Sequence, residues 1–482
     1  MKKNINLLLV LFFLISSYAS ALTVIDVTNT DDSGTGSLRA AIIQANTGPV
    51  DTYDIQFNAV LDGQTLTLLS NLPNIMVDMT ITGLAGGGIT ISGAGSFTMF
   101  TVAASKTLTV SGLTLTNNTT GNGNVFYGNA ANLVASDMVV TGITNNYAFY
   151  SQNSGSSINF TNSTFTSNSA YVFGSDHGQT PSTTSNIETD YTNRITVTGS
   201  TFSSNTGKIF RTERFVKIDA CNFINNTNVI AEFRGLNRYQ VLNSTFTNNS
   251  YAGSMFSFTS NAPGEPYLSG LGANNHLFDG NTFTGNSGTI VNPGNSGWEA
   301  KTTISNNIFS NNNAKWSGSP AVITGNTYDD LIASVSHDVD TNRMVVIMNT
   351  AVFNTNGGSG ALEANDFEFS LSGGTATLGS TVPTSISNSG NTYYLGLNIS
   401  GTINGAELLS VDPIIDSIYD ASANKAGALQ ANGSSNLVVP VTLVTKYGEI
   451  ATSNANTVNA NGALGTGGGV DENGKTTVII ED

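Results

Sequence analysis

Short stretches of alternating apolar and polar residues recur through the middle of the chain, each followed by a polar turn. The recurring unit is a small polar residue, any residue, an aromatic residue, two further residues and an asparagine. Regular copies occupy Ser163–Asn168, Ser200–Asn205, Cys221–Asn226, Ser244–Asn249, Asn281–Asn286 and Asn307–Asn312, and a degenerate copy follows at Asn326-Thr327-Tyr328. This alternation predicts short strands with one buried face.

A period of about 19–26 residues without a helical pattern predicts a solenoid of strands. Stacked coils would place each phenylalanine over the last one, and each asparagine at a turn, where asparagine tolerates left-handed backbone geometry. Leucine-rich repeats share the period but need inward leucines and a helical arm, which the repeats lack. We therefore predict an all-β chain in which residues 85–330 form a parallel β-helix of about ten coils, which the resemblance described below implies to be right-handed.

The first twenty-one residues read as a signal peptide. Lys2 and Lys3 precede the apolar run Leu7–Ile15, and Ala19-Ser20-Ala21 is a small-residue cleavage site. The apolar run is too short to span a bilayer comfortably, and no other segment approaches the length of a membrane span. We expect a protein that is secreted or held on the outer cell surface, without a membrane span.

The segment that follows contains Ser37-Leu38-Arg39-Ala40-Ala41-Ile42 and then Ala45-Asn46. It resembles the N-terminal cap of bacterial exported right-handed parallel β-helix repeat proteins, whose pattern has Cys and Glu where this chain has Gly36 and Ala40. The resemblance implies a helical cap with first strands over residues 22–84 and a pectin-lyase-like fold. It also implies an adhesin-like role, as in many members, or polysaccharide degradation, as in a few. Ser37 suits the N-cap of the short helix, and we expect Arg39 to be structural.

The repeat stops near residue 331, where strands separated by Gly, Asn and Ser turns predict a β-sandwich. Leu362–Phe367 and Ile418–Asn424 resemble the immunoglobulin-like modules of bacterial surface proteins, although Ala423 replaces the glycine of their usual closing turn. We therefore expect an immunoglobulin-like module over residues 331–435 and a partial further β module or tail over 436–482.

Charge and cysteine content narrow the function classes. The 17 basic and 33 acidic residues give a formal net charge of −16, which excludes a general nucleic-acid binder. The single cysteine, Cys221, excludes a disulfide framework and falls where other copies carry serine, so we expect it to be structural. Three histidines far apart in sequence make a zinc site unexpected.

One segment reverses the charge of the chain. Residues 208–238 hold six basic residues and three acidic ones, an excess of +3. Arg211 and Arg234 stand equally far before the repeat phenylalanines Phe223 and Phe246, so we expect them to be neighbours in adjacent coils. Guanidinium groups suit carboxylate or sulfate recognition. The predicted ligand-binding residues are Lys208, Arg211, Arg214, Arg234, Arg238, Tyr191 and Tyr239.

Two insertions, Gly174–Asn193 and Thr259–Asn275, flank the basic coils and should leave the same edge of the solenoid. Together they predict a groove for an extracellular anionic polysaccharide or surface glycan, bound by a monomeric, adhesin-like rod. Alternatively, nearby acidic residues neutralise the arginines and the rod is purely structural.

A second alternative is a polysaccharide lyase or glycoside hydrolase, with acid and base groups drawn from Asp176, His177, Glu188 and Asp190. No motif of pectate lyases or polygalacturonases is present, so we expect binding rather than catalysis. No cofactor is expected. Asp338–Asn342 places oxygen donors at alternate positions, as a Ca²⁺ loop does, but lacks the following glycine and the distal glutamate.

Overall fold

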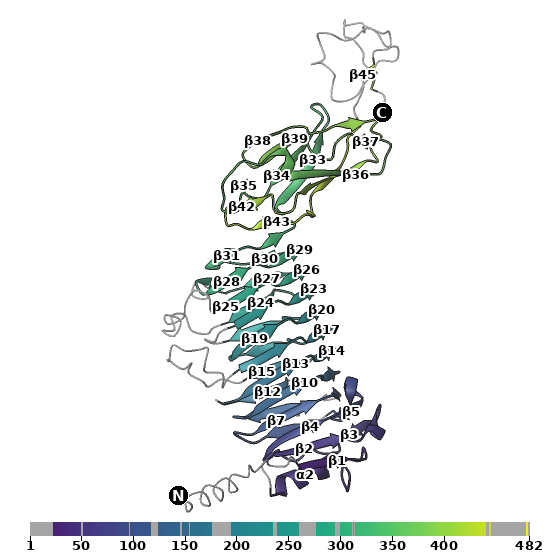
Figure 1. Ribbon diagram of the computed structural model, residues 1–482, viewed down its shortest axis with the longest axis vertical. Helices are drawn as coiled ribbons and strands as arrows, with labels where there is room; N and C mark the ends of the chain where they lie inside the picture. The colour runs from purple at the N-terminus through teal and green to yellow at the C-terminus, as the bar shows by residue number, and fades with distance from the viewer. Residues whose placement is uncertain are drawn as a thin grey trace, which may run out of the picture. The chain divides into compact units, whose positions relative to one another are not determined.

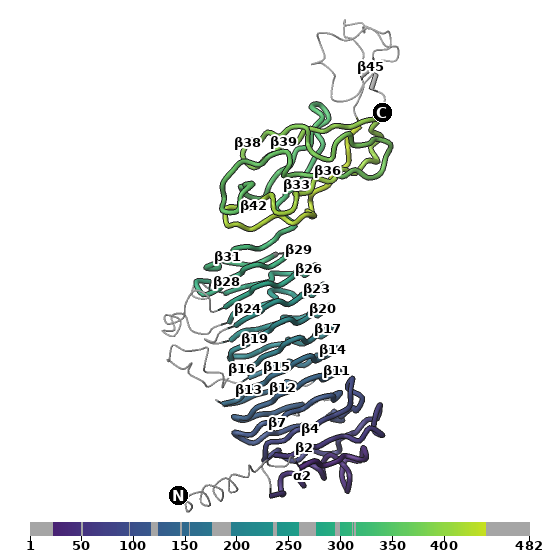
Figure 2. Tube along the Cα trace, viewed as in Figure 1, coloured from purple at the N-terminus to yellow at the C-terminus, as the bar shows by residue number. Residues whose placement is uncertain are grey.

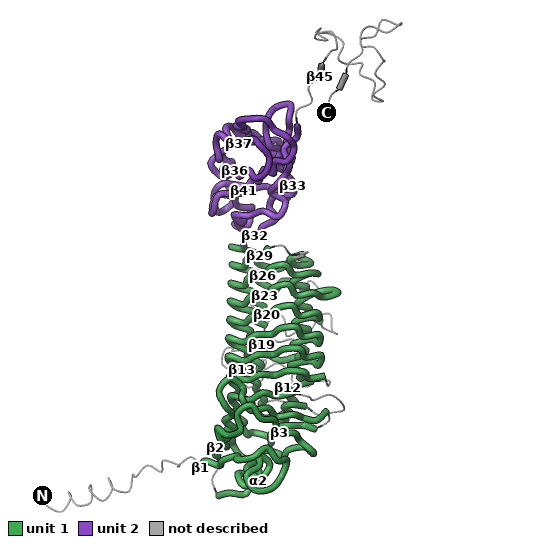
Figure 3. Tube along the Cα trace, turned by 90° about the vertical axis from the view of Figure 1, so that its right-hand side faces the viewer, with its two compact units in different colours: residues 1–326 green, residues 327–482 purple. Residues whose placement is uncertain are grey.

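The structure is a computed structural model that describes residues 23–49, 52–95, 97–116, 124–144, 147–153, 155–175, 194–234, 239–259, 276–294, 299–310, 312, 314–439, 443–444 and 479–480. The chain divides into two compact units, Met1–Asn326 and Thr327–Asp482 (Figure 3). No helix of the described residues is long and apolar enough to cross a membrane.

The first unit is a solenoid in which the chain visits three parallel sheets in turn, here called A, B and C (Figure 1). Sheet A has 12 strands: β1 (Thr23–Val27), β2 (Thr52–Phe57), β4 (Asp78–Thr82), β7 (Thr107–Ser111), β10 (Asn132–Ser136), β13 (Ser157–Thr161), β16 (Arg194–Thr198), β19 (Phe215–Asp219), β22 (Tyr239–Leu242), β25 (His276–Asp279), β28 (Thr302–Ser305) and β31 (Val322–Thr324). In this unit, sheet B runs through β3 (Thr65–Thr67), β5 (Ile89–Ser92), β8 (Leu113–Thr116), β11 (Val139–Thr141), β14 (Thr164–Thr166), β17 (Thr201–Ser203), β20 (Asn222–Ile224), β23 (Thr245–Thr247), β26 (Thr282–Thr284) and β29 (Ile308–Ser310).

Sheet C completes each coil and carries the candidate site. Its nine strands are β6 (Phe100–Val102), β9 (Phe126–Asn129), β12 (Tyr147–Gln152), β15 (Tyr171–Ser175), β18 (Phe210–Thr212), β21 (Ala231–Arg234), β24 (Ser254–Thr259), β27 (Thr289–Asn292) and β30 (Ala314–Trp316). Each strand pairs in parallel with the equivalent strand of the next coil, as from β12 to β15 to β18. The predicted right-handed parallel β-helix is confirmed.

A column of phenylalanines fills the core behind sheet B. Phe165, Phe202, Phe223 and Phe246 are register partners in successive strands and are fully buried. Successive rings stack with centroids 4.6, 4.6 and 4.7 Å apart and interplanar angles of 8° or less. The column continues through Phe283 to Phe309, as the repeat predicts.

The repeat asparagines form a second column, but not for the expected reason. The left-handed residue of the turn is the one before, such as Ser204 (φ 54°) or Asn225 (φ 55°). Asn205 and Asn226 themselves are buried. The Asn226 side-chain oxygen accepts bonds from the backbone N–H of Asn205 at 3.0 Å and from its side-chain amide at 2.9 Å. The asparagine is therefore a buried hydrogen-bonding ladder residue, and the preceding residue makes the turn.

A parallel ladder of small polar residues lines the turn from sheet A to sheet B. Cys221 occupies one rung, where its backbone N–H donates to the Ser244 hydroxyl at 3.0 Å and its thiol donates to the Val197 carbonyl at 3.4 Å. Burial raises the pKa of the Cys221 thiol to about 11. A thiol held protonated is a poor nucleophile, which agrees with a structural role.

Helix α2 (Leu38–Thr47) packs against β1 and β2 at the start of the solenoid. The Ser37 hydroxyl accepts a hydrogen bond from the Ala40 amide at 3.2 Å, as expected for an N-cap. Arg39 bonds the Asp32 carboxylate at 2.6 Å and the Asn71 carbonyl at 2.6 Å. Arg39 therefore ties the cap to a later coil. Short 3₁₀ turns follow at η1 (Ala59–Leu61) and η2 (Ala85–Gly87).

The second unit is built from antiparallel sheets and small strand groups, and the immunoglobulin-like assignment of this region stays a prediction. One sheet contains β33 (Ile332–Asp338), β34 (Arg343–Met348), β39 (Thr392–Gly396) and β38 (Ile386–Ser389). Another contains β36 (Phe367–Ser372), β41 (Leu408–Pro413) and β44 (Ser434–Asn436). The short elements are β32 (Thr327–Tyr328), β35 (Val352–Phe353), η4 (Ala364–Asp366), β37 (Thr377–Leu378), β40 (Ile399–Ser400), β42 (Tyr419–Asp420), β43 (Lys425–Ala426), β45 (Leu443–Val444) and β46 (Ile479–Ile480).

The candidate Ca²⁺ loop joins β33 to β34. One oxygen of the Asp338 carboxylate accepts bonds from the Thr341 hydroxyl at 2.6 Å and from the Arg343 Nε at 2.9 Å. This aspartate therefore already has a cationic partner within its own hairpin. The expectation of no cofactor, with Ca²⁺ as the alternative at this loop, stays a prediction.

A buried carboxylate organises the second unit. Glu407 accepts hydrogen bonds from the backbone amides of Thr375, Ala376, Asn404 and Gly405 at 2.9, 3.2, 3.0 and 3.0 Å. Burial by itself raises the pKa of this carboxyl, but the amides outweigh burial and lower the pKa to about 2. The charged form of Glu407 therefore stabilises the fold by holding two loops together.

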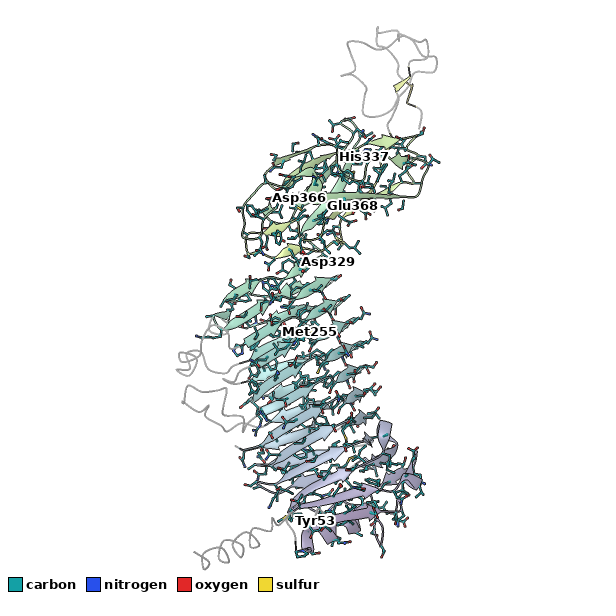
Figure 4. All side chains as sticks on the ribbon, viewed as in Figure 1. Tyr53, Met255, Asp329, His337, Asp366 and Glu368 are labelled. Carbon is teal, nitrogen blue, oxygen red and sulfur yellow. The ribbon has the colours of Figure 1, made fainter. Side chains whose placement is uncertain are left out.

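We expect Glu407→Gln to lower the thermal unfolding midpoint of the second unit at pH 7. The folded-state pKa of about 2 lies below the ordinary 4.5, so the stabilisation is complete above pH 4.5 and is lost as the pH falls towards 2. The midpoint difference between wild type and variant should shrink over that range in scanning calorimetry. The control is Glu368→Gln on β36, an exposed side chain (Figure 4). A pH-independent difference would contradict this account.

Candidate functional site

The register of sheet C brings one outward-facing row of residues into line. The row runs from Tyr127 on β9 through Tyr150, Gly174 and Arg211 to Glu232 on β21. Inward positions alternate with it and carry the core, as at Phe173. The chain passes through these strands in successive coils (Figure 2), so residues far apart in sequence share one face.

The basic part of this face surrounds a single carboxylate. Glu232 is bonded by the Lys208 ammonium, and its other oxygen lies 3.8 Å from the Arg211 Nε and 3.5 Å from the Arg234 Nε. The three cationic side chains are 28–30% exposed, whereas Glu232 is 14% exposed. We call Lys208, Arg211, Arg234 and Glu232 the cationic cluster. Three cations and one carboxylate leave an excess of two positive charges.

The predicted pairing of Arg211 with Arg234 is wrong in register. Arg211 lies opposite Glu232, and Arg234 lies opposite Thr259. The turn from sheet C to sheet A is two residues longer after β21 than after β18. Arg234 therefore lies two positions beyond Glu232, the residue that pairs with Arg211. The two arginines still meet, because both contact Glu232. Glu232 relieves the repulsion between the two arginines, a role that the residue pattern alone does not reveal.

Two of the predicted binding residues, Arg214 and Tyr239, are buried. Arg214 is 4% exposed, and its guanidinium donates to the Asn153 carbonyl at 2.6 Å, so it braces a turn two coils away. Burial lowers the pKa of Arg214 to about 10, which leaves it charged at neutral pH. Tyr239 is fully buried and stacks on Phe233 at 4.0 Å. Neither side chain offers a surface to a glycan.

The remaining predicted site residues lie outside the described residues, and their roles stay predictions. They are Asp176, His177, Glu188, Asp190, Tyr191 and Arg238. The described strands do show where both insertions begin and end. Segment 176–193 joins β15 to β16 and segment 260–275 joins β24 to β25. Both therefore connect sheet C to sheet A, one on each side of the coils that hold Arg211 and Arg234.

Beside the cationic cluster lies a tyrosine cluster that the sequence argument missed. Tyr147, on β12, has its ring centroid 5.0 Å from that of Tyr150 and 5.1 Å from that of Tyr171. Tyr127 stacks on Tyr150 at 6.1 Å. All four side chains are only partly buried. Aligning sheet C on Phe126, Phe149 and Phe173 would have revealed them, because the tyrosines stand one residue after or two before these phenylalanines.

Arg211 joins the two clusters. Its Nη1 donates to the Tyr147 hydroxyl at 2.5 Å, and its guanidinium carbon lies 5.4 Å from the Tyr171 ring centroid. Partial burial acts to lower the pKa of Arg211, but the bond to Tyr147 and the charge of Glu232 raise it overall. The guanidinium therefore keeps its charge under all ordinary conditions.

The cationic cluster and the neighbouring tyrosines provide cations, aromatic rings and the Glu232 carboxylate on this face. In the described part of the chain, no group of three His, Cys, Asp or Glu side chains could hold a metal ion. This geometry fits recognition of an anionic, ring-bearing ligand.

No family model and no curated protein sequence matches this chain. Several solved structures are similar at low identity. ORF18 of Geobacillus virus E2 is 13% identical with a TM-score of 0.41, over 95% of this chain and 86% of that one. A pectate lyase is 15% identical with a TM-score of 0.33, over 62% and 79%. The A-module of a mannuronan C-5 epimerase of Azotobacter vinelandii is 11% identical with a TM-score of 0.30, over 63% and 98%.

Proposed function

We propose that this protein is an exported, adhesin-like rod that binds an anionic polysaccharide at the cationic cluster. The supporting observation is the excess of positive charge around Glu232 in a chain whose net charge is −16. Three partly exposed cations held against one carboxylate can exchange part of that contact for a carboxylate or sulfate of the ligand. The ligand class is therefore a uronate-bearing or sulfated glycan.

The proposal also includes the location and the accessory parts expected from the sequence. The signal peptide over residues 1–21 would export the chain, and an immunoglobulin-like module after the solenoid would serve as a spacer. We propose a monomer, because the repeats of one chain already form a continuous binding face.

Arg234→Ala tests the proposal with least disturbance, because the one ion pair of its side chain among the described residues is to Glu232. We expect the dissociation constant for an anionic glycan to rise about tenfold, the effect of losing one charge-assisted hydrogen bond. The loss should diminish as salt is raised, since screening weakens exposed charges. A panel of alginate, pectin and sulfated oligosaccharides first identifies a glycan that binds. Titration calorimetry then measures its affinity for wild type and variant.

Lys217→Ala is the matched control. Lys217 is a partly exposed cation on sheet A whose ammonium lies 2.9 Å from Asp219, and its loss should leave binding unchanged. Equal affinity of wild type and Arg234→Ala would reject the cationic cluster as the binding site. Release of new reducing ends or unsaturated uronates from the bound glycan would instead establish the catalytic alternative. An absence of binding across the panel would favour the purely structural alternative.

A further inference from the structure

Gly174 interrupts the outward row of sheet C between Tyr150 and Arg211. Its backbone does not require glycine, because it is not among the described residues with a left-handed φ. A strand interior normally disfavours glycine, which contributes no packing and loses more entropy on folding. We infer that glycine is present here because a side chain at this position would collide with a neighbouring group.

The Tyr147 ring occupies that space. A Cβ built on Gly174 would overlap the Cδ1 and Cε1 atoms of Tyr147 and lie 3.0 Å from its Cγ. A Cβ at an outward position points away from the sheet, so the ring lies against the outer surface of β15. The Tyr147 side chain is partly exposed, so part of the ring remains accessible at the surface.

Neighbouring groups hold this ring in place. Arg211 bonds its hydroxyl at 2.5 Å. Tyr150 and Tyr171 flank it with interplanar angles of 37° and 35°. An aromatic surface ordered before binding loses little entropy when a ligand packs on it.

We propose that Tyr147, lying over Gly174, is a sugar-stacking platform of the same binding site; this inference rests on the proposed function. A pyranose ring presents C–H groups on one face, which pack against an aromatic ring, while its carboxylate or sulfate reaches the cationic cluster. Arg211 contacts both Tyr147 and Glu232, so it lies where the two parts of the ligand meet.

The tyrosines also set the extent of the ligand. Tyr150 and then Tyr127 continue the aromatic surface away from the cations, towards β9. A chain of several sugars covers all the tyrosines and the cationic cluster, whereas a single sugar reaches only Tyr147 and the nearest part of the cationic cluster. The ligand class is therefore a linear polysaccharide with an anionic sugar at Arg211 and Arg234 and further rings across the neighbouring coils.

The experiment compares full-length variants by titration calorimetry with galacturonate and alginate hexamers and the corresponding single sugars, at low and high salt. Tyr147→Ala should weaken hexamer binding about fivefold to tenfold. This factor should persist at high salt, where the effect of Arg234→Ala falls. Tyr147→Phe keeps the ring and should bind within about twofold of wild type.

Gly174→Ala tests the platform without altering a ring or a charge. The added methyl group must displace Tyr147, so hexamer binding should weaken as in Tyr147→Ala. Gly253→Ala is its control, because a methyl group there meets open space. Thermal melts establish that each variant is folded at the assay temperature.

The outcomes separate the two proposals. Loss of binding in Arg234→Ala with wild-type affinity in Tyr147→Ala and Gly174→Ala would overturn the platform and leave the proposed function intact. An effect of Tyr147→Ala that disappears at high salt would also overturn it, because stacking is not screened. If neither hexamer binds wild type and no panel glycan does, both proposals fall.

Discussion

Replacing Asn226 with alanine is expected to destabilise the solenoid by about 3–5 kcal/mol. The Asn226 side-chain oxygen accepts two bonds from Asn205, and its amide donates to the Phe202 carbonyl at 3.0 Å and to the Asn249 side chain at 2.9 Å. Alanine leaves the two N–H groups of Asn205 buried without that acceptor, and each unpaired buried group costs about 1–3 kcal/mol. The loss should appear as a lower free energy of unfolding in guanidinium titrations followed by circular dichroism.

Asn222→Ala provides the comparison within the same coil. Asn222 is exposed on the outer face of β20, so its loss should change the free energy of unfolding by no more than about 0.5 kcal/mol. If the two alanine variants were equally stable, the ladder would contribute nothing beyond a surface asparagine.

Phe223→Ala is expected to cost about 3–5 kcal/mol for a different reason. Its ring is fully buried and stacks on Phe202 and Phe246 at 4.6 and 4.7 Å, so its removal leaves a cavity between two rings that the strand spacing keeps apart. Phe223→Leu fills much of that volume and should cost less than half as much in the same titrations. A leucine variant as unstable as the alanine variant would show that ring stacking, rather than filled volume, determines stability here.

The fold could be predicted from the sequence because the repeat itself records the stacking. Phe165, Phe202 and Phe223 recur with a fixed local pattern, and a parallel solenoid is the arrangement that aligns them. The two insertions could also be predicted, because the distance between successive repeats exceeds the length of one coil at these places. The local residue pattern and the coil length together were therefore sufficient to predict the architecture.

Register within sheet C was harder to predict, because the turns to sheet A differ in length. Arg211 and Arg234 are equally far from Phe223 and Phe246 in sequence, which suggests equivalent positions only if the turns have equal length. The turn after β21 has two more residues than the turn after β18. Tyr239 was predicted as a binding residue beside the groove, but its alternation within β22 directs it into the core. A sheet should be aligned on its own inward residues.

The tyrosine platform could not be inferred from residue types alone. Gly174 looks like an ordinary turn residue at the start of an insertion, and it becomes informative only when its neighbours across the sheet are known. Likewise, Glu232 entered the sequence argument as one acid in a charge count. Its position between three cations follows from strand pairing. Sequence can propose the groups of a site, but their partners depend on register.

The asparagine column has a direction. Each side-chain oxygen faces the backbone N–H of the preceding coil, as from Asn168 to Asn205 and from Asn249 to Asn286, so every carboxamide points the same way along the solenoid axis. Turning one carboxamide over would set N–H against N–H on one side and oxygen against oxygen on the other. The orientation is therefore inherited from rung to rung, and a newly added coil can join the column in only one sense.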